Sequence, residues 1–328
     1  MKSLFVFFIF ILIAAFLVSA GLSISFLVGV NPALSFPQAN HIEAKISAPY
    51  LAVLLPDSRE AFMRELLEGI QLEANHDKVE MEVATYGLSE GSAVANMERL
   101  TLARVAGILL LPPEDPQILK AINQAEAHGI PVVLLDRDFP QSRRRAFVGP
   151  SPYQVGNEMA RLIVKLGLKE IHVGVLLSQV DQKHQTVSSS LLVNGIADGL
   201  DKKNTPLDMD ERISPPGRFA GEELVWQLFY SDPKLNVLVT TTAKDSLSAL
   251  QAVLEANKLG TVNLIAVGED HELKDSLRQG VLKGLILRDP IGWGKTAVQT
   301  LVDILQGKSV SSYISLPVRG YSNGDQLP

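Results

Sequence analysis

The chain contains no cysteine, and this absence excludes several kinds of protein at once. Without a thiol there is no disulfide, no thiolate-bound metal, no cysteine nucleophile and no lipid on an N-terminal cysteine. Aromatic residues are scarce as well, at 6% of the 328 residues, whereas hydrophobic residues make up 46%. A core of mainly aliphatic side chains is typical of α/β layers, and the length is sufficient for two ordinary domains.

Motifs of common enzyme classes are also lacking. No G-x-G-x-x-G follows a predicted strand, and no G-x-S-x-G elbow occurs. The segment Gly292–Thr296 is similar to the end of a phosphate-binding loop, but the glycine required five positions before Gly294 is Asp289. We therefore interpret this segment as a helix start. The six histidines show no metal-ligand spacing. We expect no catalytic residue, no metal, no cofactor and no enzymatic activity.

The formal net charge of −6 argues against a nucleic-acid binder, which normally carries a basic surface. No helix-turn-helix module precedes residue 50, which argues against a DNA-binding repressor. The basic run Arg143–Arg145 is expected in a solvated loop, and a contact with a partner or a phospholipid is the lesser alternative. His271 is expected at the surface, at the start of a helix, and a pH-sensitive ligand contact is the lesser alternative.

The N-terminal segment indicates the location of the protein. After Lys2, an apolar run extends from Leu4 to about Val30. As a helix it would span roughly 40 Å at about 1.5 Å per residue, which exceeds a bilayer core of about 30 Å. We predict a transmembrane anchor at residues 1–30, with a cleaved signal segment ending near Ala20 as the alternative. Lys2 favours a cytoplasmic N-terminus and an extracytoplasmic remainder at the cell membrane, joined by a linker at residues 31–48.

From Tyr50 onward, short apolar runs alternate with longer amphipathic ones. Runs such as Leu51–Leu55 and Val132–Leu135 predict buried strands, and the segments between such runs have apolar residues at helical spacing. Ser58 is expected to cap the helix after the first strand. The repeated strand–helix–strand order predicts parallel sheets with right-handed crossovers. A second series begins near Ser151, so we predict an α/β fold with two Rossmann-like lobes.

Polar side chains stand directly after several predicted strands. In open α/β sheets, ligands bind outside the carboxyl ends of the strands. Carboxylate and guanidinium groups bind neighbouring hydroxyls well, and an aromatic ring beside them can cover the face of a sugar. We therefore expect these groups to form one cleft for a small polar solute rather than separate solvated loops. They are Asp57–Met63, Asp136–Asp138, Thr240–Thr242, Gly268–Asp270 and Arg288–Asp289.

Three stretches carry a resemblance to a known family. Phe62–Met63 followed by Leu67–Gly69, the segment Gly129–Arg137 with sequence GIPVVLLDR, and the strand end Ala266–Asp270 match recognisable family patterns. Through them, residues 49 to 320 resemble the ribose- and galactose-type periplasmic binding proteins (type I). The resemblance implies two lobes joined by a three-crossing hinge that closes around a ligand. The crossings are expected near 148–152, 286–290 and 312–318.

The resemblance also implies a set of ligand-binding residues. Phe62 would stack on the ligand, and Asp136 and Arg137 would bind its hydroxyls. Asp270 would do so from the second lobe, and Arg288 stands where the family often has a polar ligand contact near a hinge. The sequence departs from the family pattern where Met63, Ser190 and Thr242 replace an aromatic residue, an arginine and an asparagine. The complete predicted set is Arg59, Phe62, Met63, Asp136, Arg137, Ser190, Thr242, Asp270 and Arg288.

Domain limits and two alternative functions follow from this resemblance. The N-terminal lobe is expected to comprise 49–149 plus 289–314, and the C-terminal lobe 150–288 plus 315–328. In the first function, the chain captures a sugar or polyol and presents it to the permease of an ABC importer. In the alternative, it is an anchored sensor whose closure is read by a receptor such as a histidine kinase. The apolar N-terminal segment and the altered second lobe favour the sensor, and family frequency favours the importer.

Overall fold

The computed structural model describes residues 50–87, 92–113, 115–178, 187–201, 207–214 and 220–328. The predicted anchor (1–30) and linker (31–48) lie outside this set. Among the described residues, no helix has both the length and the apolar character required to cross a membrane. Ala48–Pro328 is one compact unit, which contains both sheets.

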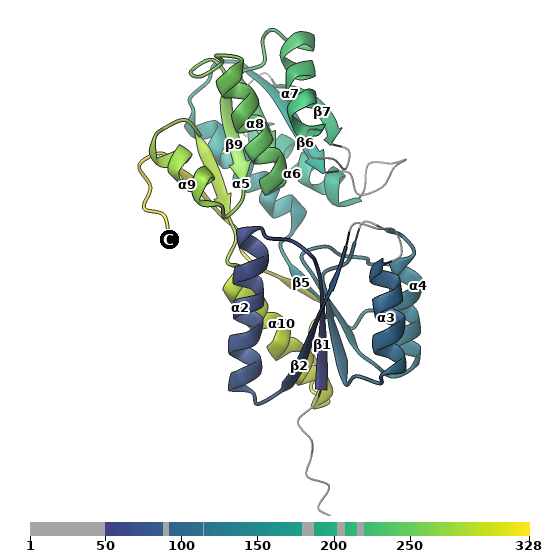
Figure 1. Cartoon of the computed structure of the whole chain (residues 1–328). Helices are drawn as coiled ribbons and strands as arrows, with labels where there is room; N and C mark the ends of the chain where they lie inside the picture. The colour runs from purple at the N-terminus through teal and green to yellow at the C-terminus, as the bar shows by residue number, and fades with distance from the viewer. Residues whose placement is uncertain (1–49, 88–91, 114, 179–186, 202–206, 215–219) are drawn as a thin grey trace, which may run out of the picture. The chain divides into compact units, whose positions relative to one another are not determined.

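The first sheet has six strands in the order β11-β5-β4-β3-β1-β2, and all neighbouring pairs are parallel. Its strands are β1 (Tyr50–Pro56), β2 (Glu80–Tyr86), β3 (Gly107–Leu110), β4 (Val132–Leu135), β5 (Ala146–Gly149) and β11 (Tyr313–Ser315). Every residue of β3, β4 and β5 is buried, because helices cover both faces of the sheet. In Figure 1, α2 (Ala61–His76) and α10 (Pro290–Leu305) lie on one face, and α3 (Ser92–Leu102) and α4 (Ile118–Ala127) on the other.

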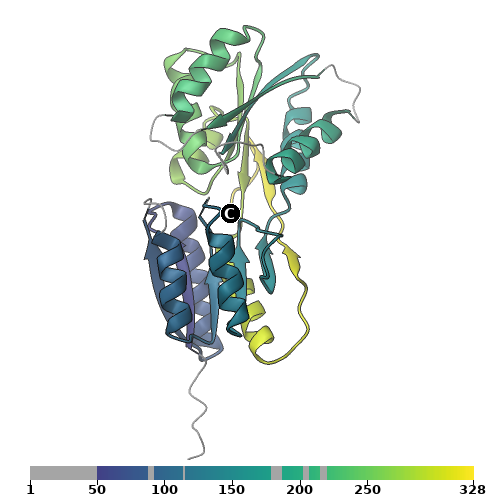
Figure 2. The same ribbon diagram turned by 90° about the vertical axis from the view of Figure 1, so that its right-hand side faces the viewer.

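The second sheet also has six strands, in the order β12-β10-β9-β8-β6-β7. Its strands are β6 (Ile171–Ser178), β7 (Leu207–Ser214), β8 (Val237–Thr240), β9 (Asn263–Val267), β10 (Gly284–Leu287) and β12 (Arg319–Ser322). Helices cover both of its faces (Figure 2), with α5 (Pro152–Lys165) and α6 (Val187–Asp201) on one side and α7 (Ala220–Ser231), α8 (Ala243–Glu255) and α9 (His271–Arg278) on the other. The predicted α/β fold with two lobes of parallel sheet is confirmed. β12 departs from it and runs antiparallel to β10, because it follows β11 directly, without a crossover helix.

Within the described residues, the chain passes between the two sheets at three places. The first lies between β5 and α5, at 150–151, and the second between β10 and α10, at 288–289. The third lies between β11 and β12, at 316–318. Arg288 therefore stands on one of these passages, immediately after β10.

The beginnings of two helices test predictions made from the sequence. The segment after Asp289 is a helix start, as predicted, and the Asp289 carboxylate accepts the N–H of Gly292 at 2.9 Å. The prediction for Ser58 is wrong, because α2 begins at Ala61 with Glu60 as its capping residue. The Ser58 hydroxyl instead accepts the N–H of Glu60 at 3.2 Å, a local turn that competes with helix capping.

The basic run Arg143–Arg145 is not a uniformly solvated loop. Arg143 and Arg145 are exposed, but the side chain of Arg144 is only 10% exposed. Its guanidinium forms a two-pronged ion pair with Asp138 and donates to the carbonyl of Ser312 at 2.8 Å. The middle arginine therefore ties the loop after β4 to the segment before β11, and the expectation of a solvated run is wrong for this residue.

Glycine allows unusually close packing of one helix pair in each lobe. A Cβ at Gly69 of α2 would lie 2.1 Å from the carbonyl oxygen of Ile291 in α10, and a Cβ at Gly294 would lie 2.4 Å from that of Leu66. In the second lobe, a Cβ at Gly156 of α5 would meet a carbonyl oxygen of α6 at 2.1 Å. Both helix pairs thus depend on residues without a side chain.

Candidate functional site

Arg288 forms the centre of the candidate site. It follows β10, and its guanidinium reaches the buried side chain of Glu269, which follows β9. Nε and Nη2 of Arg288 donate to the two carboxylate oxygens of Glu269 at 2.9 and 2.8 Å, and its backbone N–H donates to one of them at 3.1 Å. Bidentate pairs of this kind fix orientation as well as charge. The Glu269 side chain is only 2% exposed.

The guanidinium of Arg288 lies against the ring of Phe62, in α2. Its Cζ atom is 3.8 Å from the ring centroid, a close cation–π contact. Trp293 of α10 packs edge-on against the same ring, at 5.7 Å between centroids and 81° between planes. Phe62 and Trp293 are each 2% exposed and belong to the core of the first lobe. Arg288 therefore packs on the core of the first lobe, while Glu269 of the second lobe forms hydrogen bonds with its guanidinium.

Asp136 adds a second carboxylate to this centre. It follows β4 with a φ of 59°, a left-handed conformation that aspartate tolerates better than most residues. Its Oδ1 lies 3.7 Å from Nη1 of Arg288, the nitrogen that Glu269 does not hold. The chain from β9 to Glu269 turns at Gly268, whose φ of 148° strains any other residue. The positive φ angles at Asp136 and Gly268, one in each lobe, therefore direct the carboxylates of Asp136 and Glu269 toward Arg288.

Glu60, immediately before α2, belongs to the same electrostatic group. Its pKa is raised above the ordinary value of a glutamate, chiefly because its carboxyl is partly withdrawn from water. Arg288 and Lys244 lower this pKa, and Asp270 and Glu269 raise it further. Glu60 is thus affected by the charges of Arg288, Glu269 and Asp270, which lie between strands and helices, and of Lys244 in α8.

The charge of Arg288 is held firmly. Burial alone would lower its pKa, but the charge and hydrogen bonds of Glu269, with smaller effects of Asp136 and Glu60, raise it above the value of a free arginine. A buried cation with this set of partners stays charged at any physiological pH.

The other predicted residues have varied surroundings. Arg137 donates from Nη1 to the carbonyl of Pro112 at 3.0 Å, which places its head group beside the end of β3. Asp270 is the capping residue of α9 and is half-buried. Thr242 caps α8, because its hydroxyl accepts the N–H of Asp245 at 3.1 Å and donates to the Asp245 carboxylate at 2.7 Å. That hydroxyl is engaged in holding the helix.

The structure brings together only some of the predicted set. Arg288 contacts both Phe62 and Asp136, and Asp270 joins this group through its effect on the pKa of Glu60. Arg59 is exposed before α2, Met63 packs against the first-lobe core, and Ser190 is half-buried in α6. No contact of these last three with Arg288 emerges among the described residues, and their binding roles stay predictions.

Sequence reasoning missed Glu269 and Glu60 as members of the site. Glu269 was visible as a polar residue after a strand, but Asp270 beside it matched the family pattern. Only the folded backbone shows which of the two acidic side chains turns inward to Arg288. Glu60 lies within the polar segment Asp57–Met63 predicted for the cleft, but nothing in the sequence distinguished it from the rest of that segment.

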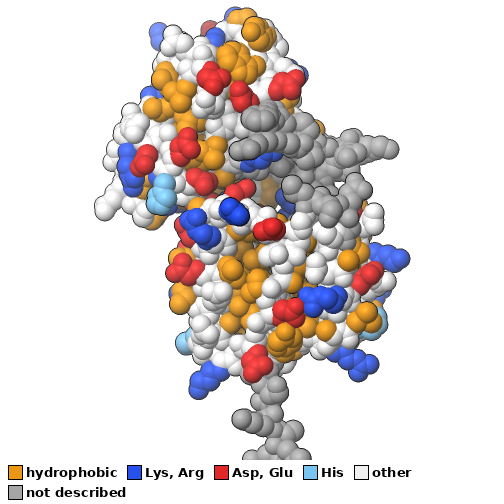
Figure 3. Space-filling view, viewed as in Figure 1, with side chains coloured by type: hydrophobic (Ala, Val, Ile, Leu, Met, Phe, Trp, Pro, Cys, Tyr) orange, Lys and Arg blue, Asp and Glu red, His pale blue; other side chains and the backbone are white. Residues whose placement is uncertain are grey.

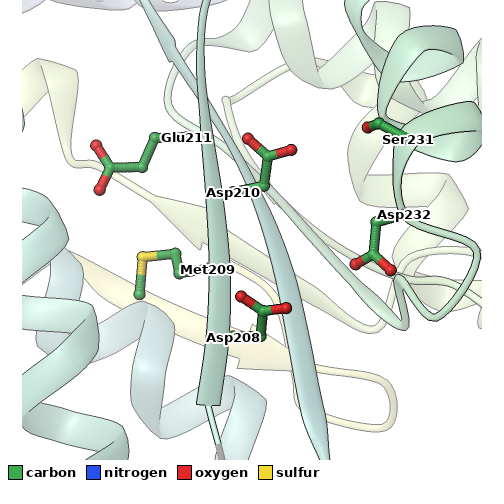
Figure 4. A pocket seen from close by; sticks show the side chains of 6 residues that line it. All are labelled: Asp208, Met209, Asp210, Glu211, Ser231 and Asp232. Atoms are coloured by element: carbon green, nitrogen blue, oxygen red, sulfur yellow. The ribbon is translucent and has the colours of Figure 1, made fainter.

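A polar hollow lies at the far end of the second sheet, away from the carboxyl ends of its strands. Figure 4 shows Asp208 and Asp210 on one side of β7, with Asp232 facing them, and Met209 and Glu211 on the other side. His172, paired with Asp208 across β6 and β7, has its Nδ1 3.5 Å from an Asp208 oxygen and 3.9 Å from one of Asp232. Residues that are distant in the chain form this group, so it cannot be recognised from residue spacing in the sequence. The Asp208 side chain is 74% exposed, and exposed acidic groups are common without an ion, so we assign no role to them.

The distribution of charge fits a small partner at the carboxyl-end site. On the face shown in Figure 3, basic and acidic side chains are interspersed, without the extended basic patch expected for nucleic-acid binding. The two sheets direct the carboxyl ends of β4, β9 and β10 to the Arg288 centre. This is the edge at which open α/β sheets bind small ligands.

The fold and this arrangement define a two-lobed binding protein, and sequence comparison identifies its family. A family model described as "Periplasmic binding protein domain" matches residues 51–309. The chain belongs to this family, and the predicted resemblance to type I periplasmic binding proteins is confirmed.

Individual relatives are distant but cover nearly the whole domain. The ribose import binding protein RbsB of Bacillus subtilis is 24% identical over 263 residues, which is 79% of this chain and 82% of the relative. The crystal structure of GanP, a glucose-galactose binding protein from Geobacillus stearothermophilus, superposes with a TM-score of 0.74 at 21% identity, over 83% of this chain and 97% of that one. A structure of the XylFII–LytSN complex gives a TM-score of 0.73 at 22% identity, over 85% and 99%. At such identities the structures establish the fold alone.

Proposed function

We propose that the chain is an extracytoplasmic solute-binding protein that captures a small polar ligand, a sugar or a polyol, between its two lobes. The observation that carries this proposal is the meeting of polar groups from both lobes at Arg288, at the carboxyl ends of their sheets. The names of its relatives, which include a ribose import binding protein, support a sugar-like ligand. No bond need be made or broken, because closure of the lobes is a binding event.

The ligand would be delivered to the permease of an ABC importer. Family membership supports this role, since the relative from Bacillus subtilis is named for ribose import. An anchored sensor is the second candidate. It is favoured by the apolar segment from Leu4 to Val30 and by the similarity to XylFII, which forms a complex with LytSN. In both cases the partner would read the closed state.

Arg137 provides a direct test of the binding site. We expect Arg137→Ala to weaken binding of the preferred sugar or polyol by roughly 2–5 kcal/mol, the usual cost of removing one partner from a buried charged contact. A thermal-shift screen against monosaccharides and polyols would find the ligand, and titration calorimetry would compare the affinities. Lys295→Ala is a suitable control, because Lys295 is exposed on α10. Equal affinity in Arg137→Ala and the parent would reject the assignment of Arg137.

The membrane anchor is tested separately. We propose that residues 1–30 hold the protein at the membrane, with the binding lobes outside the cytoplasm. Membrane fractionation of cells expressing the full chain is expected to leave it with the bilayer, and alkaline carbonate should not extract it. A shortened protein found in the soluble fraction, beginning at Gly21, would establish a cleaved signal segment instead.

A further inference from the structure

The aromatic face predicted to receive a sugar ring already carries a side chain of the protein itself. The Arg288 guanidinium lies 3.8 Å from the centroid of Phe62. The ring is 2% exposed, and the side chain of Arg288 only 15%. A sugar that stacks on an aromatic residue covers the same kind of ring face. A ligand ring and the Arg288 guanidinium cannot share the place on Phe62 that Arg288 fills.

The hydrogen bonds of Arg288 hold it in this place. Two of its nitrogens donate to Glu269, and the third faces Asp136 at 3.7 Å. A ligand that displaces Arg288 leaves the Glu269 carboxylate without its partner. The side chain of Glu269 is only 2% exposed. An uncompensated charge at such a buried position is strongly unfavourable. The same pairing occupies the Nε–Nη2 edge of the guanidinium, and the Asp136 carboxylate faces the remaining nitrogen, so the arrangement does not favour an acidic ligand.

We infer that Arg288, held by Glu269, is a specificity-determining residue that fills the stacking face of Phe62 and makes the site prefer open-chain polyols to cyclic sugars. The inference rests on the proposed function and narrows its ligand class. A cyclic sugar gains affinity from laying a ring face on an aromatic side chain. An open-chain polyol binds through its hydroxyls, for which Asp136, Arg137 and Asp270 provide charged partners. Filling the stacking face therefore penalises the ring and spares the open chain.

Matched pairs of aldose and alditol test the inference on the full chain, solubilised in detergent if it fractionates with membranes. Titration calorimetry with ribose against ribitol, and xylose against xylitol, compares ligands that differ mainly in ring closure. For the unaltered protein we expect the alditol of at least one pair to bind about tenfold more tightly than its aldose. This comparison requires no variant.

The double variant Arg288→Gln with Glu269→Gln removes both charges together and opens the face of Phe62. We expect the affinity ratio to move toward the aldose by about tenfold. Asp303→Asn with Lys308→Gln is the matched control, because it removes an ion pair of 2.7 Å between the last turn of α10 and the segment after it, outside the candidate site. Circular dichroism of both variants verifies that they are folded, and the control is expected to keep the parent ratio.

The outcomes separate this inference from the proposed function. Tighter binding of the aldoses by the unaltered protein, with a ratio that the double variant does not move, would overturn the inference and leave the proposed function standing. If neither the parent nor the double variant binds any member of the pairs or of the wider sugar and polyol screen, the proposed function fails, and the inference fails with it.

Discussion

Replacing Gly69 with alanine is expected to lower the free energy of unfolding by about 1–3 kcal/mol, the range found for overpacked cores. A Cβ at this position would lie 2.1 Å from the carbonyl oxygen of Ile291. That oxygen belongs to the backbone of the first turn of α10, so it cannot rotate away as the end of a side chain could. The helices must move apart. The higher helix propensity of alanine, worth about 1 kcal/mol, offsets only part of this cost.

Urea unfolding followed by circular dichroism measures the effect, and Gly87→Ala is its control. A Cβ at Gly87 meets no atom within 4 Å. Its replacement is expected to change stability by less than about 0.5 kcal/mol. If Gly69→Ala and Gly87→Ala unfolded at the same urea concentration, the close approach of α2 and α10 would not matter for stability.

The same substitution should also reach the binding site, because α2 carries Phe62 and α10 begins two residues after Arg288. Separating these helices changes the 3.8 Å contact between the guanidinium and the ring. Gly156→Ala gives a matched comparison, since it creates an equally short contact of 2.1 Å between α5 and α6. We expect both variants to be destabilised, and Gly69→Ala to disturb ligand specificity more.

The fold was predictable because buried parallel strands have a plain signature. Runs such as Leu51–Leu55 and Val132–Leu135 are apolar throughout, since helices cover both sheet faces. Two of the strands that the sequence did not predict, β7 and β11, lack this signature. β7 (Leu207–Ser214) lies at the sheet edge and is exposed or half-buried except at Ser214, and β11 (Tyr313–Ser315) has only three residues, two of them exposed. Edge position and shortness remove the pattern on which a sequence prediction depends.

The candidate site was predictable only in outline. Polar residues after strands predicted a group of side chains at the carboxyl ends of the strands, and Phe62 and Asp136 do meet Arg288 there. The sequence could not show that Arg288 turns toward Phe62 instead of toward a ligand. That orientation depends on Glu269, whose inward direction is set by the backbone at Gly268. Contacts between residues distant in the chain decide which polar groups are available for a ligand.

Replacing Arg288 with alanine is expected to reduce the free energy of unfolding by about 3–5 kcal/mol, the range for breaking a buried ion pair from one side. Glu269 would keep its buried position, 2% exposed, and lose both side-chain donors. The raised pKa of Arg288 means that its contribution to stability is fully present below the ordinary arginine pKa and is lost only as the pH rises through the still higher pKa in the folded protein. The deficit of Arg288→Ala should therefore persist across the whole neutral range, as urea unfolding at several pH values would measure.

Two comparisons identify the buried charge as the cause of this deficit. Arg278→Ala breaks a surface ion pair with Asp275, in which both side chains are 57% exposed. It should lower the free energy of unfolding by less than about 1 kcal/mol. The double variant Arg288→Gln with Glu269→Gln removes both charges, so it should be markedly more stable than Arg288→Ala. A loss in Arg288→Ala as small as that in Arg278→Ala would mean that Glu269 reaches water or another partner once the arginine is gone. Arg288 could then leave the face of Phe62, and a ligand ring could stack there.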